Sequence, residues 1–258
     1  MTNPVLLASG IGMMAVGIVP VLYWAKTRGV KATPFVFGGA LWVAAIAPKA
    51  AIDLTMGGSI SSWANSILGA LGAFIFLSLY VGLRTGAFES GFSYLTFLKT
   101  RLRNASYEEA IGFGLAFGGT EAILLGLGSF LNVLLFWLNP SLVEQIPVAQ
   151  RESVVAALNA PSIMVFAPIV ERGFTILVHL FATMLVYAAV LGQSPRLFWF
   201  SFLYRAGIDA MVPGFGRLLG ESSDPVVMTY AIELVIATYG SLGLLGVRWL
   251  RGRAGRPG

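Results

Sequence analysis

The stretch GFGLAFGGTEAILLGLG, residues 112–128, sets one glutamate in the middle of a long apolar run. A helix of roughly 20 apolar residues crosses the hydrocarbon core of a bilayer. An ionised group at that depth is costly unless it is paired or hydrated, so it is functional by default. The stretch therefore predicts a membrane-spanning helix that carries a functional carboxylate, Glu121.

The composition of the whole chain agrees with a membrane location. Of 258 residues, 57% are hydrophobic and 11% are charged, whereas about a quarter of the residues in a typical soluble domain are charged. This excludes a water-soluble globule. The chain has no cysteine and one histidine, which excludes disulfide frameworks, zinc fingers and His-rich metal cages. The net charge of +5 is typical of membrane proteins with basic cytoplasmic loops, so no nucleic-acid partner is expected.

Seven apolar stretches, separated by Gly, Pro or charged residues, predict an all-α polytopic protein with about seven transmembrane helices. These stretches are residues 5–25, 34–56, 62–83, 108–138, 162–191, 197–215 and 226–247. No repeat, long linker or low-complexity tract interrupts the chain. Residues 1–258 are therefore expected to form a single integral membrane domain, passing several times through the cell membrane.

The distribution of basic residues sets the expected orientation. With seven spans, twelve basic residues fall in loops on one side and two on the other, and the basic side of a membrane protein is cytoplasmic. This indicates an outer N-terminus and a cytoplasmic C-terminus. The inner set is Lys26, Arg28, Lys31, Arg84, Lys99, Arg101, Arg103, Arg196, Arg248, Arg251, Arg253 and Arg256, and the outer set is Arg151 and Arg217.

Ionisable residues also occur in the fifth and sixth spans. The run APIVERGFTILVH, residues 167–179, and the run YRAGIDA, residues 204–210, bring carboxylates, arginines and the single histidine to depths close to that of Glu121. Residues four positions apart on a helix share a face. Glu171, Thr175 and His179 are therefore expected to face one cavity. The candidate site residues are Glu121, Glu171, Arg172, His179 and Asp209.

Other polar residues are interpreted as structural. Lys49 and Asp53 have the i, i+4 spacing of a local ion pair near the outer boundary, and they are left outside the site with Glu233. Arg205 and Asp209 have the same spacing, so a local salt bridge is an alternative for them. The stretch 88–104 has an apolar stripe opposite basic residues, which predicts a helix on the inner surface.

The neighbouring pair Glu171 and Arg172 and the glycines near Glu121 each give a further prediction about helix contacts. Glu171 and Arg172 point about 100° apart on a helix, so each is expected to contact other helices rather than its neighbour. Gly114 and Gly118 form a GxxxG step, which predicts a close helix–helix approach beside Glu121.

These motifs resemble those of the YhfC-type membrane peptidases. The Gly-rich run that ends in Glu121 and Ala122, the Pro-x-x-Glu-Arg run that ends in His179, and Asp209 on the next span carry the likeness. That family is similar to the CAAX-protease and bacteriocin-processing group and to the PrsW proteases. The resemblance implies a glutamic-type intramembrane protease, in which a glutamate activates water while His and Asn or Asp residues complete the site. Related groups tend to carry His where this chain has Arg205.

The preferred hypothesis is a peptidase that acts on membrane-embedded or membrane-proximal peptides or membrane proteins. A carboxylate in a partly dry pocket can take a proton from water, and a neighbouring His can stabilise the oxyanion. Glu121 or Glu171 is then the base, His179 the oxyanion or proton partner, and Arg172 and Asp209 position the others, with no cofactor or metal. The alternatives are a proton-coupled transporter, a metal-dependent membrane hydrolase with Glu, His and Asp ligands, and an inactive protease-like scaffold.

Overall fold

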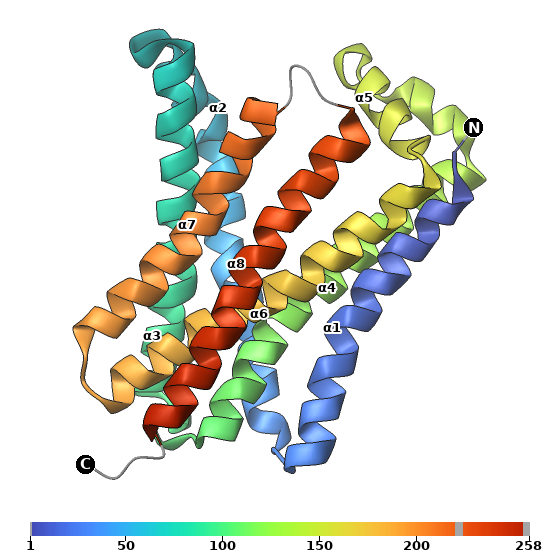
Figure 1. Cartoon of the computed structure of the whole chain (residues 1–258). Coiled ribbons are helices and arrows are strands. Elements are labelled where there is room, and N and C mark those ends of the chain that lie inside the picture. Colours follow the sequence, from blue (N-terminus) through green and yellow to red (C-terminus); the bar gives the residue numbers. More distant parts are fainter. Residues whose placement is uncertain (1, 220–223, 255–258) are drawn as a thin grey trace.

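Helices make up almost all of the chain, which is shown as a computed structural model in Figure 1. The structure describes residues 2–219 and 224–254. The α-helices in these ranges are α1 (Leu7–Arg28), α2 (Ala32–Thr85), α3 (Gly91–Lys99), α4 (Tyr107–Leu138), α5 (Val148–Leu158), α6 (Phe166–Leu191), α7 (Pro195–Leu219) and α8 (Pro225–Ala254). Shorter helical turns are η1 (Pro4–Leu6), the π-helical η2 (Gly86–Ser90), η3 (Arg101–Asn104), η4 (Pro140–Gln145) and η5 (Ser162–Val165). The predicted all-α class is confirmed for the described residues.

Helix α2 folds back on itself at Gly69. This residue has φ 66° and ψ 176°, a backbone conformation open essentially only to glycine. The rings of Trp63 and Phe76 lie on either side of the turn with their centroids 5.4 Å apart. A straight helix would separate these positions by roughly 20 Å, because each residue adds 1.5 Å. The two arms of α2 therefore run antiparallel. The predicted span 34–56 lies on the first arm, whereas the turn divides the predicted span 62–83 between the two arms.

The position of this turn corrects a prediction. The sequence predicts a break within residues 57–61, where Gly57, Gly58 and several serines cluster, but the helix continues through them. A glycine inside a helix costs only about 1 kcal/mol, so neighbouring contacts can override it. A reversal of the chain needs a different backbone conformation, and Gly69 adopts it.

The other long helices begin at residues that the sequence marks. The Ser106 side chain accepts a hydrogen bond from the Glu109 backbone, and the Glu109 carboxylate accepts one from the Ser106 backbone, which starts α4. Helices α7 and α8 each begin at a proline, whose missing N–H has no partner in a first turn. The predicted spans 5–25, 108–138, 162–191, 197–215 and 226–247 fall on η1 with α1, α4, η5 with α6, α7 and α8, in that order.

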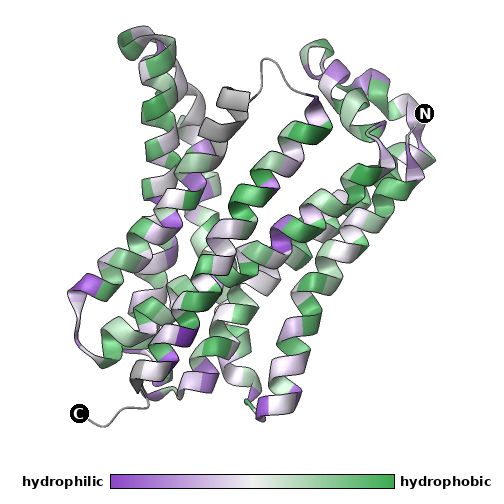
Figure 2. Cartoon of the chain, in the orientation of Figure 1, coloured by the Kyte–Doolittle hydropathy of each residue, from purple (hydrophilic) through white to green (hydrophobic). Residues whose placement is uncertain are grey.

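The side chains are distributed as in a membrane protein. Large apolar side chains such as Leu54, which is 88% exposed, face outward, whereas Arg205 is only 1% exposed. Figure 2 shows hydrophobic residues along most of each long helix. Five stretches of the described residues are long and apolar enough to cross a membrane. Because apolar surface on this scale is stable only in lipid, the chain is a multi-pass membrane protein.

The number of crossings and their orientation stay predictions. The five stretches count the folded-back Ala32–Lys99 once and do not include α7. The start of α1 and the end of α8 lie at opposite ends of the bundle (Figure 1), as an odd number of crossings requires. Three basic residues of the orientation argument, Arg217, Arg253 and Arg256, fall outside the side chains that the structure describes.

The turn at Gly69 generates a prediction. Gly69→Ala is expected to destabilise the chain by about 1–3 kcal/mol, because a β-carbon disfavours its backbone conformation. Gly58→Ala is the matched control, since Gly58 lies in the helical part of α2 with no atom near the position of a β-carbon. That control is expected to be neutral or stabilising. Thermal unfolding in detergent compares the two, and equal midpoints would contradict the assigned turn.

Candidate active site

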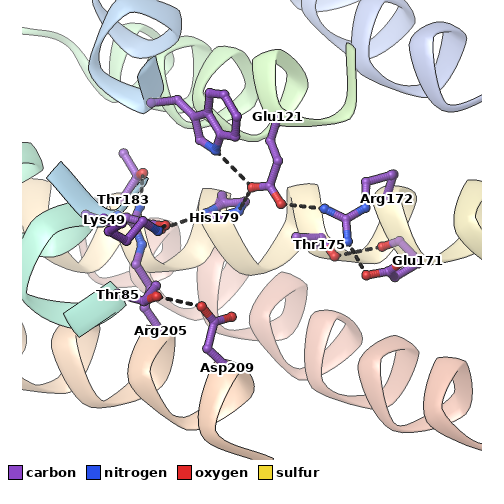
Figure 3. Close-up of polar contacts among 12 residues, drawn as sticks. Lys49, Thr85, Glu121, Glu171, Arg172, Thr175, His179, Thr183, Arg205 and Asp209 are labelled. Carbon is purple, nitrogen blue, oxygen red and sulfur yellow. Dashed lines mark hydrogen bonds and ion pairs between the residues drawn. The ribbon is translucent and has the colours of Figure 1, made fainter. Parts of the chain in front are cut away.

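A polar cavity of about 370 Å³ lies inside the helix bundle. Its walls come from α2, η2, α4, α6, α7 and α8. All the residues predicted for the site line it, and Figure 3 shows how they lie: Glu121, Glu171, Arg172, His179 and Asp209. The structure therefore brings these side chains from three helices together. Their roles in catalysis stay predictions.

Glu121 on α4 has three polar partners in the cavity. Its Oε2 atom accepts a hydrogen bond from Trp42 Nε1 at 3.1 Å and lies 2.7 Å from His179 Nε2. Its Oε1 atom accepts a hydrogen bond from Arg172 (Figure 3). The Glu121 side chain is 16% exposed. Both carboxylate oxygens are thus held in place, and the carboxylate still reaches the cavity.

His179 on α6 lies between two glutamates. Its Nε2 atom faces Glu121, and its Nδ1 atom lies 3.6 Å from Glu89 Oε2. Gly118 on α4 makes room for the ring, because a β-carbon at Gly118 would lie 3.0 Å from Ile176 Cα and 3.2 Å from His179 Cδ2. The close approach predicted from the GxxxG step is confirmed here.

Arg172 bridges the two carboxylates at one side of the cavity. Its guanidinium donates to Glu121 and to the neighbouring Glu171. The expectation that Arg172 contacts another helix is confirmed by its bond to Glu121 on α4. The expectation that Glu171 and Arg172 do not contact each other is wrong, because the long arginine side chain can bend back along its own helix. Thr175 donates to the backbone carbonyl of Glu171 at 2.8 Å, and its side chain lines the cavity as predicted.

Asp209 and Arg205 on α7 have different partners from those expected. Asp209 accepts a hydrogen bond from Thr85 Oγ1 at 2.6 Å. Arg205 Nη1 lies 3.7 Å from Glu89 Oε2, and its guanidinium lies over the Phe117 ring at 4.7 Å. The carboxylate nearest to Arg205 is thus Glu89. The alternative of a local salt bridge between Arg205 and Asp209 is wrong, because each side chain has a different partner.

Sequence reasoning missed the buried ion pair of Lys49 and Glu89. The two side chains meet at 2.6 Å and are 9% and 5% exposed. The predicted pair of Lys49 with Asp53 is wrong, because Asp53 binds Arg84 instead. The fold-back at Gly69 explains both contacts, since it brings together residues far apart in the sequence.

Glu89 lies in the π-helical turn η2, which continues α2 into α3. Such turns are frequent at functional sites. The stretch 88–104 is predicted to lie as a helix on the inner surface, yet Ser90 and Ser93 are fully buried beside Glu89, and α3 packs against α6. These small polar residues next to an acid are the sequence signal that could have identified Glu89.

Opposite charges are nearly balanced around the cavity. Its carboxylates are Glu89, Glu121, Glu171 and Asp209, and its permanent cations are Lys49, Arg172 and Arg205. Removing one member of such a buried set leaves an uncompensated charge in a medium of low dielectric constant. The arrangement can hold a water molecule or a polar substrate group and can exchange protons with it.

The fold and the cavity define a multi-pass membrane protein with an ionisable site among its helices. Comparison with family models places the chain more specifically. The model described as YhfC intramembrane metalloprotease matches residues 12–221, and the chain belongs to this family. It is an intramembrane protease by that membership. No curated protein and no solved structure matches the chain.

The family description bears on the hypotheses from the sequence. It confirms the resemblance to the YhfC family and the expectation of a membrane peptidase. It names a metalloprotease, so it does not support the glutamic mechanism. Among the hypotheses, it favours the metal-dependent membrane hydrolase.

The residues of the cavity do not fit a catalytic divalent ion. Such ions commonly have three protein ligands, and no group of three His, Cys, Asp or Glu side chains within the described residues is placed to hold one. Glu121 and Glu89 face opposite ring nitrogens of His179, so an ion at one nitrogen is remote from the other carboxylate. Arg172 and Lys49 already compensate these two carboxylates.

The Lys49–Glu89 pair generates a stability prediction. Glu89→Met leaves Lys49 buried without its carboxylate partner, so it is expected to lower the free energy of unfolding by about 3–5 kcal/mol. The double variant Lys49→Met with Glu89→Met removes both charges of the pair and is expected to recover part of that loss, since Arg205 still lacks the Glu89 carboxylate 3.7 Å away. Unfolding in mixed micelles measures all three free energies.

The exposed pair of Arg251 and Glu108 provides the control for this prediction. Their contact is 3.1 Å long, with side chains 56% and 30% exposed. Arg251→Ala is expected to cost less than about 1 kcal/mol, because water screens the charges. A cost for Glu89→Met as small as that of the control would contradict the buried pair.

Proposed function

We propose that this chain hydrolyses peptide bonds of membrane-embedded or membrane-proximal substrates in the cavity, with Glu121 and His179 as the proton-transfer pair. The observation that supports the proposal is the 2.7 Å contact of these side chains in a polar cavity of about 370 Å³. A water molecule and a peptide group both fit in that volume. Family membership supplies the class of reaction.

The reaction begins when Glu121 takes a proton from water while the water oxygen bonds to the peptide carbonyl carbon. The hydrogen bonds from Trp42 and Arg172 keep the carboxylate oriented for this step. N–H groups of His179 and Arg172 stabilise the negative charge that develops on the carbonyl oxygen. The proton then passes to the peptide nitrogen as the carbon–nitrogen bond breaks, which releases a carboxylic acid and an amine.

Glu121 is the better base of the two glutamates that the sequence leaves open. It contacts His179 directly, whereas the side-chain partner of Glu171 is Arg172. Arg172 connects the two carboxylates and so positions Glu121. Asp209 positions the opposite wall of the cavity through its hydrogen bond with Thr85.

A metal-dependent hydrolase is the second candidate, and the family description is the observation that favours it. The two mechanisms respond differently to a chelator. Cleavage that persists after dialysis against EDTA supports the side-chain mechanism, and cleavage that is lost with EDTA and restored by a divalent ion supports the second candidate.

The proposal predicts which carboxylate matters most. Glu121→Gln is expected to lower kcat by about 100-fold or more, because a positioned general base contributes about that much. Glu171→Gln is expected to have a smaller effect, since Glu171 acts through Arg172. The assay follows fluorescence from a quenched peptide of about 20 apolar residues with polar ends in proteoliposomes.

Glu108→Gln is the control for this assay, since Glu108 contacts Arg251 at the start of α4 and does not line the cavity. It is expected to cleave at the rate of the unsubstituted chain. A Glu121→Gln variant that cleaves as fast as this control would rule out the proposed base. An unsubstituted chain that cleaves none of the peptides would favour the protease-like scaffold.

A further inference from the structure

Three buried polar atoms lie close together at the Nδ1 side of the His179 ring, opposite the side that contacts Glu121. Glu89 Oε2 lies 3.6 Å from His179 Nδ1 and 3.7 Å from Arg205 Nη1. None of these three atoms has a hydrogen-bond partner, and the three residues are 4%, 6% and 1% exposed. A carboxylate, an imidazole and a third side chain that face one point are the usual start of a metal site. In this chain the third side chain is a guanidinium, which cannot be a ligand because it has no free electron pair to donate.

Arg205 is held firmly in this position. Its Nη2 atom donates to Thr183 Oγ1 at 3.2 Å, and its guanidinium lies over the Phe117 ring at 4.7 Å. A guanidinium on an aromatic face is stabilised by the negative charge of the ring face. The positive charge of Arg205 is therefore fixed beside Glu89.

Lys49 completes the arrangement from the other side. It binds Glu89 Oε1 at 2.6 Å while Arg205 approaches Glu89 Oε2. Glu89 is thus flanked by two permanent cations. A divalent ion at the same carboxylate would be repelled by both of them in a medium of low dielectric constant, where such repulsion is strong.

We propose that Arg205 and Lys49 supply the positive charge that a divalent ion would bring, so that the protease described above works without one. The claim that the protease works without a divalent ion rests on the proposed function. The claim that the unsubstituted chain binds no divalent ion in the cavity does not depend on it. The Arg205 guanidinium occupies the space beside Glu89 Oε2 and His179 Nδ1 where an ion would have to bind. The chain therefore departs from the metal dependence that its family description states.

The same geometry predicts how a metal site would arise. Arg205→His removes the guanidinium and places an imidazole at the same position of α7, which is expected to point toward Glu89 and His179 Nδ1. The point would then have one carboxylate and two imidazoles, a ligand set found in catalytic zinc sites. Lys49 remains, but one of the two repelling cations is gone.

The test measures bound metal rather than cleavage. The unsubstituted chain, Arg205→His and the control Arg251→His are purified in detergent with a tag that contains no histidine. Each is equilibrated with Zn²⁺, separated from free ion and analysed for zinc by mass spectrometry. Arg251→His adds an imidazole at an exposed position of α8, so it reports zinc that binds to any new histidine.

The expected result is about one zinc ion per chain for Arg205→His and only background zinc for the other two. Adding Glu89→Gln to Arg205→His is expected to remove the zinc. The thermal midpoint of Arg205→His is expected to rise with Zn²⁺ and to fall with EDTA, because a ligand that binds the folded chain stabilises it.

Stoichiometric zinc in the unsubstituted chain, lost in Glu121→Gln or His179→Ala, would overturn the proposal. If Arg205→His fails to fold, the zinc content of the unsubstituted chain still tests whether the cavity binds a divalent ion. Equal zinc in Arg205→His and Arg251→His would show that the three atoms do not form a latent site, and would also overturn it. A chain that binds no zinc and cleaves no peptide would overturn the proposed function but not the inference about metal.

Discussion

The fold of this protein depends on the mutual compensation of charges buried inside a membrane bundle. Four carboxylates and three permanent cations line one cavity, where an uncompensated charge would cost several kcal/mol. Most contacts in the set join different segments of the chain: α2 to η2, α4 to α6, and α7 to the second arm of α2. The arrangement of the helices and the arrangement of the charges therefore constrain each other.

This constraint explains the relation of the chain to its family. Family membership establishes an intramembrane protease, and the family description leads one to look for metal ligands. The cavity offers a single imidazole between two carboxylates, and each carboxylate is paired with a cation. Arg205 occupies a point where a neutral ligand would be needed.

Much of the fold could be predicted from the sequence because lipid imposes a simple rule on it. The long apolar runs had to be helices, and ionisable residues within them had to face inward, so Glu121, His179 and Asp209 were found. The turn at Gly69 could not be predicted, because the glycines and serines near residue 58 give a similar local signal and only the three-dimensional packing distinguishes them. The pairing of Lys49 with Glu89 depends on that turn. The pairing of Lys49 with Glu89 could therefore not be predicted from the sequence, whereas the i, i+4 spacing of Lys49 and Asp53 indicated a local pair.

The single histidine of the chain allows one direct measurement of the central arrangement. The protein is produced with ¹⁵N-labelled histidine and a tag that contains no histidine, so that the two ring signals in its nitrogen NMR spectrum come from His179 alone. The account predicts that Glu121→Gln shifts the Nε2 signal most, that Glu89→Gln shifts the Nδ1 signal most, and that Glu108→Gln shifts neither. Ring signals that match those of free histidine in water and respond to none of the three substitutions would contradict it.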